Sequence, residues 1–277
     1  MRRQDKDILN NYIVNVVICY ANEDEVIQYG RQLEKQSIKE KIILVIVINK
    51  KNKGLEYLKE ELDKIHIVYE LLQPKTNLGY LNGLIYGFSR CGVDTGWYVL
   101  SNTDIEIPNE NFFEDFLCNY ENDTKNWVVG PTVYAPLKRI NSNPYMLEKP
   151  SKFYYLSKNI GMSFPILYDY LFKIKNKLKR RELPTLKTSC SVYAVHGSYM
   201  FVRNDLLRIM TEKDKWELLY DEEQYIAEVV LSYGKNIFYD ARFLVKHMEG
   251  TSTGKVNISN RYRMMKRANK RILKEFY

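Results

Sequence analysis

Residues 13–20 read IVNVVICY and residues 42–49 read IILVIVIN, and these two runs decide the fold class. Both are nearly continuous stretches of β-branched residues, which is typical of strands buried on both faces of a parallel sheet. Between them, residues 23–36 (EDEVIQYGRQLEKQ) are polar, with apolar residues at helical spacing. The segment therefore predicts a strand, a helix and a second strand, the βαβ unit of an α/β protein.

The residues that follow continue this alternation. A third strand is expected over residues 66–71, a loop and a helix over 76–90 (TNLGYLNGLIYGFSR), and a fourth strand over 97–100 (WYVL). Polar segments stand at the expected carboxyl ends of these strands, at residues 20–24, 77–82 and 102–104. Ligands of open parallel sheets bind outside those ends, where neighbouring loops converge, so we expect the three segments to form a nucleotide-binding site.

Composition, the absence of certain motifs and the lengths of the apolar runs together exclude several classes of protein. The chain has 277 residues, 45% of them apolar and 27% charged, which is the balance of a globular protein of one or two domains. Neither GxxxxGK[ST] nor a GxGxxG after the first strand is present, which argues against a P-loop NTPase and a Rossmann dehydrogenase. No apolar run reaches the roughly 20 residues of a membrane-spanning helix, and no signal peptide is recognised, so we expect a cytoplasmic protein.

Six motifs in this chain resemble the family 2 glycosyltransferases, and within them the bacterial rhamnosyl- and galactofuranosyl-transferase-like members. The motifs are residues 19–24 (CYANED), 77–83 (NLGYLNG), 101–105 (SNTDI), 193–200 (YAVHGSYM), 221–228 (DEEQYIAE) and 247–253 (HMEGTST). The similarity runs from about residue 13 to about residue 255. It implies the GT-A fold, a single α/β domain with a Rossmann-like mixed sheet flanked by helices.

The resemblance also implies how the chain is organised. Residues 1–255 would form the GT-A domain, in which residues 13–104 are the nucleotide-sugar-binding half and residues 105–255 the acceptor-binding half. An insertion is expected around residues 135–187, and residues 256–277 are expected to form a basic C-terminal helical segment.

A metal site is predicted around Asp104, because its carboxylate follows a buried strand and a Mg²⁺ or Mn²⁺ ion bound to a diphosphate needs only one or two carboxylates. A strand-end turn is the alternative, since Asn and Asp form such turns readily. Asn102 stands at the first position of the family's Asp-x-Asp pattern, so one metal carboxylate is missing. His247 follows a strand expected over residues 243–246, where its imidazole could ligate the metal, bond a phosphate or be structural.

The residues expected to contact the nucleotide sugar lie in or beside the three polar loops: Tyr20, Asn22, Glu23, Asn77, Gly79, Asn82, Asn102 and Thr103. Residues 77–79 precede a helix, where free backbone N–H groups favour an anionic ligand or a polar base edge. Gly79 suits a close backbone approach, although an ordinary helix start would explain the same sequence. The resemblance implies that this segment lies along the nucleoside and the donor sugar.

Three acidic residues, Asp221, Glu222 and Glu223, open a helix expected over residues 221–232. The helix dipole alone would explain acidic residues at that point. In the functional interpretation, one carboxylate takes the proton of the acceptor hydroxyl, because an inverting displacement needs a base opposite the leaving diphosphate. The resemblance implies that this base is Glu223, with Glu222 as the second choice.

The sequence thus favours an inverting hexosyl- or deoxyhexosyl-transferase that moves a sugar from a UDP- or dTDP-sugar to a glycan or lipid-linked acceptor. The resemblance implies a role in bacterial surface polysaccharide synthesis, such as that of capsule or O-antigen. A sugar-phosphate nucleotidyltransferase is the alternative enzyme, although its Gly-rich basic loop is absent. A nucleic-acid-binding protein is the alternative outside enzymes, because the formal charge is +8 and 23 tyrosines could stack on bases. No RNA-binding motif is recognised, so we expect no nucleic-acid partner.

Two basic stretches with interleaved apolar residues bear on location. They are residues 173–181 (KIKNKLKRR) and 261–274 (RYRMMKRANKRILK). Such segments can bind an anionic membrane surface, here the inner face of the cell membrane, or can simply be solvated faces of charged helices.

Overall fold

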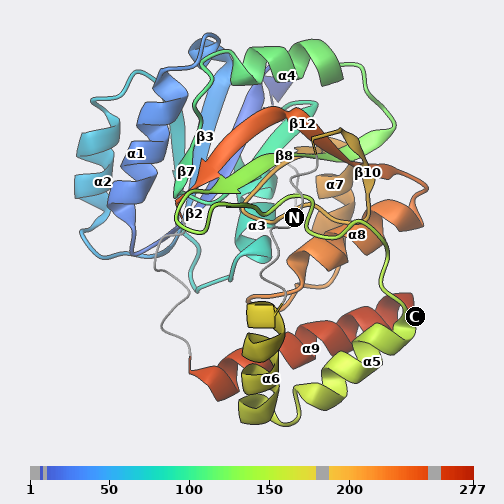
Figure 1. Ribbon diagram of the computed structural model, residues 1–277. Coiled ribbons are helices and arrows are strands. Elements are labelled where there is room, and N and C mark those ends of the chain that lie inside the picture. Colours follow the sequence, from blue (N-terminus) through green and yellow to red (C-terminus); the bar gives the residue numbers. More distant parts are fainter. Residues whose placement is uncertain (1–6, 9–10, 179–186, 249–256) are drawn as a thin grey trace.

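The computed structural model of the protein describes residues 7–8, 11–178, 187–248 and 257–277. A mixed sheet with helices on both faces forms its centre (Figure 1). In spatial order the strands are β10 (Cys190–Val192), β12 (Asn236–His247), β8 (Asn126–Ala135), β11 (Tyr199–Arg203), β6 (Trp97–Ser101), β2 (Ile13–Tyr20), β3 (Ile42–Lys50) and β4 (Val68–Leu72). Short strands β7 (Ile105–Glu106) and β9 (Ile140–Asn141) pair with β12 and β8, and β1 (Asp7–Ile8) pairs with β5 (Val93–Asp94).

The helices alternate with the strands in the first half of the chain, whereas in the second half two pairs of helices, α5 with α6 and α7 with α8, follow one another without a strand between them. They are α1 (Glu23–Glu34), the 3₁₀ turn η1 (Lys39–Lys41), α2 (Leu55–Leu62), α3 (Leu81–Arg90), α4 (Phe112–Tyr120), α5 (Lys152–Gly161), α6 (Pro165–Leu178), α7 (Asn204–Glu212), α8 (Glu222–Ser232) and α9 (Ile258–Phe276). Within the described ranges, no helix is both long and apolar enough to cross a membrane.

The parallel part of the sheet confirms the α/β prediction. Strands β2, β3, β4 and β6 run parallel to one another, and the strand expected over residues 13–20 has those limits. The third strand begins at Val68 and not at residue 66, because the backbone N–H of His66 still donates to Glu34 Oε1 of α1, 2.9 Å away. The strand expected over residues 243–246 is the end of the longer β12.

Alternate residues of β2 face two separate cores, as the pleat of a strand requires. Val14 and Val16 pack in the core that also contains apolar residues of α3, α7 and α8. Ile13 and Val17 pack in the other core, with residues of α1, α2 and α4. Both faces of the sheet are therefore covered by helices, and the strand ends are the places where polar side chains can reach a ligand.

Helices α5, α6 and α9 form a layer of their own below the sheet in the view of Figure 1. Asn269 of α9 donates to the Tyr155 carbonyl oxygen of α5 at 2.9 Å, and Arg261 of α9 forms an ion pair with Asp169 of α6. Ala268 and Ile272 of α9 also belong to the core under α3, α7 and α8. The segment expected as a basic C-terminal helix is thus a helix that packs on the rest of the protein.

Candidate active site

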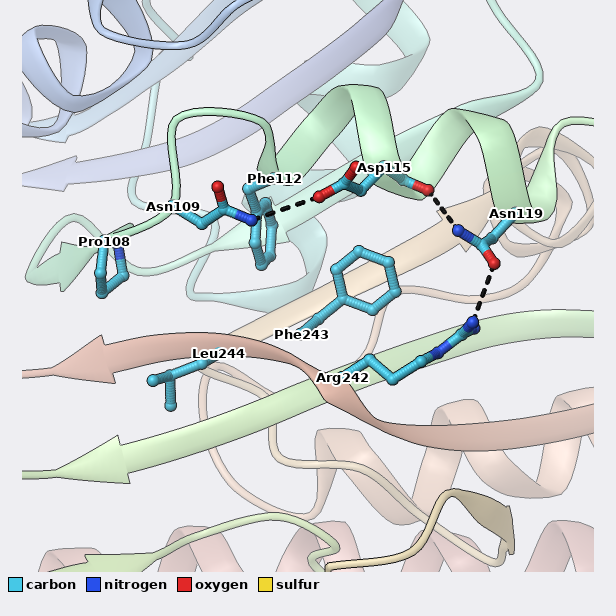
Figure 2. A pocket seen from close by; sticks show the side chains of 8 residues that line it. All are labelled: Pro108, Asn109, Phe112, Asp115, Asn119, Arg242, Phe243 and Leu244. Carbon is cyan, nitrogen blue, oxygen red and sulfur yellow. Dashed lines mark hydrogen bonds between the residues drawn. The ribbon is translucent and has the colours of Figure 1, made fainter.

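Two pockets of similar volume, about 250 and 240 Å³, are candidates for the site. The first lies between α4 and β12 and is shown in Figure 2. Its polar side chains are bonded to one another: Asn109 to Asp115, and Arg242 to Asn119 at 2.9 Å. None of the residues singled out in the sequence lines this pocket, so it offers little for the predicted chemistry.

The second pocket lies at the carboxyl ends of β2, β3 and β6, where the sequence predicts a ligand site. Seven of the predicted residues line it, namely Tyr20, Asn22, Asn77, Gly79, Asn102, Thr103 and Asp104. The remaining lining residues, which the sequence analysis did not single out, are Ile18, Glu25, Asn49, Tyr80, Ser101, Leu218, Leu219 and Met264. The segments come together because parallel strands bring their carboxyl ends to one edge of the sheet.

A hydrogen-bonded triangle joins the loop after β2 to the loop after β6. The Nδ2 atom of Asn22 donates to Thr103 Oγ1 at 2.6 Å and to Glu25 Oε2 at 2.7 Å, and the Thr103 hydroxyl donates to the same Glu25 oxygen at 2.9 Å. Glu25 is three residues after the Asn22 N-cap, a spacing typical of helix capping that could have identified it in the sequence. The triangle fixes Asn22 and Thr103, which both line the pocket.

The segment before α3 is held differently from what the sequence suggests. The backbone N–H of Leu78 donates to Asn49 Oδ1, that of Gly79 to Asn77 Oδ1, and that of Tyr80 to the Leu218 carbonyl oxygen. These three N–H groups donate within the protein and are not free to bind an anionic ligand, so they do not supply the anion contact that the sequence suggests for this segment.

Gly79 is required by a neighbouring segment of the protein itself. Its φ is +78°, and a Cβ atom there would collide with the backbone of Leu218. The close backbone approach expected of Gly79 is thus an approach to Leu218, which also lines the pocket.

Two of the residues predicted to contact the nucleotide sugar do not line the pocket. Glu23 is 2% exposed, and its Oε1 atom accepts hydrogen bonds from the backbone N–H groups of Asn52 and Lys53. Asn82 exchanges hydrogen bonds with the backbone of Trp216, accepting at 2.7 Å and donating at 2.9 Å. Both side chains hold loops around the pocket together, and Glu25 is the carboxylate of α1 that lines the pocket.

The predicted metal ligands Asp104 and His247 lie side by side. Pairing of β7 with β12 places Ile105 opposite His247, so Asp104 Oδ1 comes within 3.2 Å of His247 Nε2. The Nδ2 atom of Asn102 lies 3.3 Å from the same imidazole nitrogen. Both partner side chains remain slightly exposed, at 13% for Asp104 and 12% for His247. Residues 250–253, whose glycine and hydroxyls favour a phosphate contact, lie outside the described residues.

This donor set fits a divalent cation that takes its other ligands from a substrate. Among the described residues, no group of three or more His, Cys, Asp or Glu side chains is arranged to hold a metal ion. A carboxylate oxygen and an imidazole nitrogen beside a pocket nonetheless suit Mn²⁺, and Mg²⁺ through the carboxylate, when phosphate oxygens and water complete the coordination. Asp104 and His247 are therefore the residues that would hold such an ion.

One short segment links these residues to the acidic helix start. The ring of His196 lies 5.9 Å from that of His247, and the Gly197 backbone N–H donates to Glu223 Oε1 at 3.1 Å. Tyr80, which lines the pocket, donates its hydroxyl to the Gly197 carbonyl oxygen at 2.7 Å. Burial raises the pKa of Tyr80 well above its usual value, and the nearby carboxylates Glu222, Glu223 and Asp104 raise it further, so the phenol stays protonated.

Glu222 and Glu223 are weaker acids than ordinary glutamates. Burial raises the pKa of Glu222 well above its usual value, and the neighbouring Glu223 carboxylate adds to the shift. Burial also raises the pKa of Glu223, whose side chain is half-buried, while the hydrogen bond from Gly197 acts in the opposite direction. A carboxylate with a raised pKa can accept a proton near neutral pH, which is what a general base requires.

The backbone before α8 is strained. Tyr220 and Asp221 both have left-handed φ values, +81° and +57°, which non-glycine residues rarely adopt. Asp221 is held there by an ion pair with Lys158 of α5, 2.7 Å long, whose side chains are 4% and 10% exposed. Lys158 has no signal in the sequence, because it lies in the expected insertion and 63 residues from its partner.

Structural comparison gives three informative matches. A mannosyltransferase from Pyrobaculum calidifontis in complex with GDP-Man and Mn²⁺ aligns with a TM-score of 0.56 at 10% identity, covering 87% of this chain and 58% of that one. S. aureus TarS 1–349 in complex with UDP-GlcNAc gives 0.53 at 13% identity, covering 96% and 71%. GalNAc-T7 with UDP, GalNAc and Mn²⁺ gives 0.56 at 10% identity, covering 91% and 48%.

The fold is of the GT-A type. This confirms the expected fold class, while the rhamnosyl- and galactofuranosyl-transferase-like subgroup receives no support from these matches. The chain spans 58% of the length of the mannosyltransferase and 48% of that of GalNAc-T7. No protein-family model matches the sequence, and no curated protein matches it either.

Proposed function

We propose that this GT-A protein is a metal-assisted, inverting glycosyltransferase that uses a nucleotide-diphosphate sugar. The observation that carries the proposal is one continuous row of polar groups. It runs from the pocket at the strand ends, through the Asp104–His247 pair and the segment 196–198, to Glu223. In support, the mannosyltransferase and GalNAc-T7 structures contain Mn²⁺, and TarS was crystallised with UDP-GlcNAc.

In this proposal the pocket binds the nucleoside and the donor sugar. Asn22, Asn77, Asn102 and Thr103 offer amide and hydroxyl groups that can hydrogen-bond a base or ribose, and Tyr20 offers an exposed ring for stacking. Asp104 and His247 hold the cation. When bound, that ion neutralises the charge that develops on the leaving diphosphate. Residues 13–104 then correspond to the donor half and residues 105–255 to the acceptor half.

Glu223 is the proposed base, with Glu222 as the alternative. The base takes the proton of the acceptor hydroxyl while that oxygen attacks the anomeric carbon, and the nucleoside diphosphate leaves from the opposite face. The Gly197 N–H orients Glu223 Oε1. Glu222 is 8% exposed and so has less access to an acceptor than the half-buried Glu223. The acceptor is proposed to be a glycan or lipid-linked glycan of a bacterial surface polysaccharide.

Donor turnover can be tested without knowing the acceptor. The purified protein is incubated with UDP-, dTDP-, GDP- and CDP-sugars and Mn²⁺, Mg²⁺ or EDTA, and release of nucleoside diphosphate is measured, because many transferases slowly pass the sugar to water. We expect a UDP- or dTDP-sugar to be consumed only with a divalent ion, and to raise the melting temperature of the protein.

A parallel incubation with nucleoside triphosphates and sugar phosphates tests the alternative enzyme. Pyrophosphate release from a nucleoside triphosphate and a sugar phosphate would instead identify a nucleotidyltransferase. The proposed function would be overturned if no nucleotide sugar were consumed and none raised the melting temperature.

A further inference from the structure

Helices α5 and α6, with the turn between them, carry a concentration of exposed apolar side chains. Of the 21 large apolar residues that are exposed among the described residues, ten fall within residues 153–174, so the surface is not the ordinary scatter of a soluble protein. These ten, which we call the apolar face, are 38–79% exposed: Phe153, Tyr154, Leu156, Ile160, Phe164, Ile166, Leu167, Tyr170, Leu171 and Ile174.

The apolar face is one side of an amphipathic pair of helices. On α6, Leu167, Leu171 and Ile174 follow the spacing that puts residues on one side of a helix. The other side of α6 contacts α9 through Asp169, which pairs with Arg261. On α5, Tyr155 is fully buried, and its carbonyl oxygen accepts from Asn269 of α9. Each helix therefore has one side that packs on α9 and another that nothing in the described protein covers.

The formal charge of helices α5, α6 and α9 indicates which kind of partner the apolar face would bind. Helices α5, α6 and α9 together contain twelve lysines and arginines and two acidic residues, a formal charge of +10, whereas the whole chain carries +8. The rest of the protein is therefore slightly negative. On α9 the exposed basic residues are spaced along one side of the helix, at Arg263, Arg267, Lys270 and Lys274.

The two acidic residues of this layer are already paired. Asp169 forms ion pairs with Lys173 and Arg261, and Glu275 forms one with Arg271. The layer thus presents apolar and positive side chains without an unpaired acidic residue in its described part.

We propose that the layer of α5, α6 and α9 docks on an anionic lipid bilayer. The apolar face enters the boundary between headgroups and acyl chains, and the basic residues bind lipid phosphates and carboxylates. A second copy of this surface, related by twofold symmetry, would bring two layers of +10 together and is disfavoured by repulsion. Nucleic acid would use the charge but would leave the apolar face exposed to water.

The docking layer is in contact with the candidate site. Helix α9 contributes Met264 to the pocket, and α5 contributes Lys158 to the ion pair with Asp221. The proposal nevertheless does not depend on glycosyl transfer, since its test measures only binding.

The test is flotation of the full chain with vesicles of phosphatidylcholine alone or with roughly one third phosphatidylserine. We expect binding only to the anionic vesicles, and loss of that binding as salt is raised. The apolar variant combines Phe164→Ser, Leu167→Ser and Leu171→Ser, whose side chains are all more than half exposed. It should lower the partition coefficient by about tenfold or more, because three apolar side chains no longer enter the bilayer.

The charge variant combines Arg263→Gln, Arg267→Gln and Lys270→Gln. Each basic residue near the surface contributes about fivefold to partitioning, so the triple variant should bind about 100-fold more weakly. Two matched controls lie outside the layer, Val68→Ser with Leu137→Ser for the apolar variant and Lys41→Gln with Lys51→Gln and Lys59→Gln for the charge variant. Both controls should bind like the unmodified protein.

Several results would overturn the proposal. Equal binding to neutral and anionic vesicles would do so, as would an apolar variant that melts normally and still floats like the unmodified protein. If the unmodified protein is a dimer in sedimentation and the apolar variant a monomer, the face is an interface between two copies. If RNA binds in a salt-dependent way that the apolar variant retains, while anionic vesicles do not bind, the charge serves nucleic acid.

Discussion

At the pocket end of the candidate site, Asn22 and Thr103 follow two neighbouring parallel strands and are held by short hydrogen bonds to Glu25. At the other end, Glu222 and Glu223 follow a strained turn that depends on an ion pair with a distant helix. The first end is set by sheet topology and local turn chemistry. The second depends on tertiary packing and on buried charge, so the two ends should respond differently to substitution and to pH.

The largest effect is expected from Asp104→Asn. Loss of the carboxylate that would hold the cation should lower donor turnover by about 10⁴-fold and abolish the metal dependence of nucleotide binding, with little change in melting temperature. Calorimetric titration of UDP and dTDP, with and without Mn²⁺, measures the binding. Asp115→Asn, in the other pocket, is the matched control and should behave like the unmodified protein. An unchanged metal response in Asp104→Asn would make Asp104 a turn residue only.

Glu223→Gln tests the acidic end directly. The amide keeps the size of the side chain and can still accept from Gly197, but it takes no proton. Turnover with acceptor should fall by about 10²- to 10⁴-fold, while the dissociation constant of the donor stays nearly constant. Glu222→Gln is the companion variant. If only that variant loses turnover with intact donor binding, the base is Glu222, and full activity in both would remove the proposed base mechanism.

Lys158→Met separates the two ends by stability. Removal of the cation leaves the buried Asp221 carboxylate unpaired, which should lower the free energy of unfolding by about 3–5 kcal/mol in denaturant titrations. Lys149→Met is the control, because its partner Glu228 keeps hydrogen bonds from Tyr193 and Tyr277. This variant should lose less free energy of unfolding than Lys158→Met. Addition of Asp221→Asn to Lys158→Met should restore part of the loss, and equal losses in the single and double variants would contradict this account.

The smallest expected effect is the pH dependence contributed by Glu222. Its pKa is raised in the folded protein, so the folded state binds the proton more tightly than the unfolded chain does. This contribution stabilises the protein at low pH and is lost as the pH rises from the ordinary Glu value of 4.5 through the raised pKa. Glu222→Gln should therefore lose less stability than the unmodified protein between about pH 5 and pH 8.

Melting temperatures across that pH range measure this difference. Glu56→Gln, at an exposed position of α2, serves as the control and should leave the pH profile unchanged. Parallel pH profiles for Glu222→Gln and the unmodified protein would show that ionisation of Glu222 does not destabilise the fold.

Parts of the candidate site could be predicted from local sequence. The strand ends at Tyr20 and Ser101 and the polar residues after them follow from runs of buried residues that stop at turn-forming side chains. Glu25 was within reach through its spacing from Asn22. Glu23 and Asn82 do not line the pocket, and the sequence could not show this because a polar residue in a loop looks the same whether it faces a pocket or ties two loops together.

The sequence by itself therefore determined the parallel sheet, the edge at which its loops gather, and the chemical types of the residues there, because period and turn chemistry are local properties of the chain. Only the tertiary structure decided which of those residues face the pocket. It also brought Tyr80, Lys158 and Met264 to the site and set Gly79 against the backbone of Leu218. These contacts join segments far apart in the chain, so they depend on how the helices and strands pack together and leave no local pattern in the sequence.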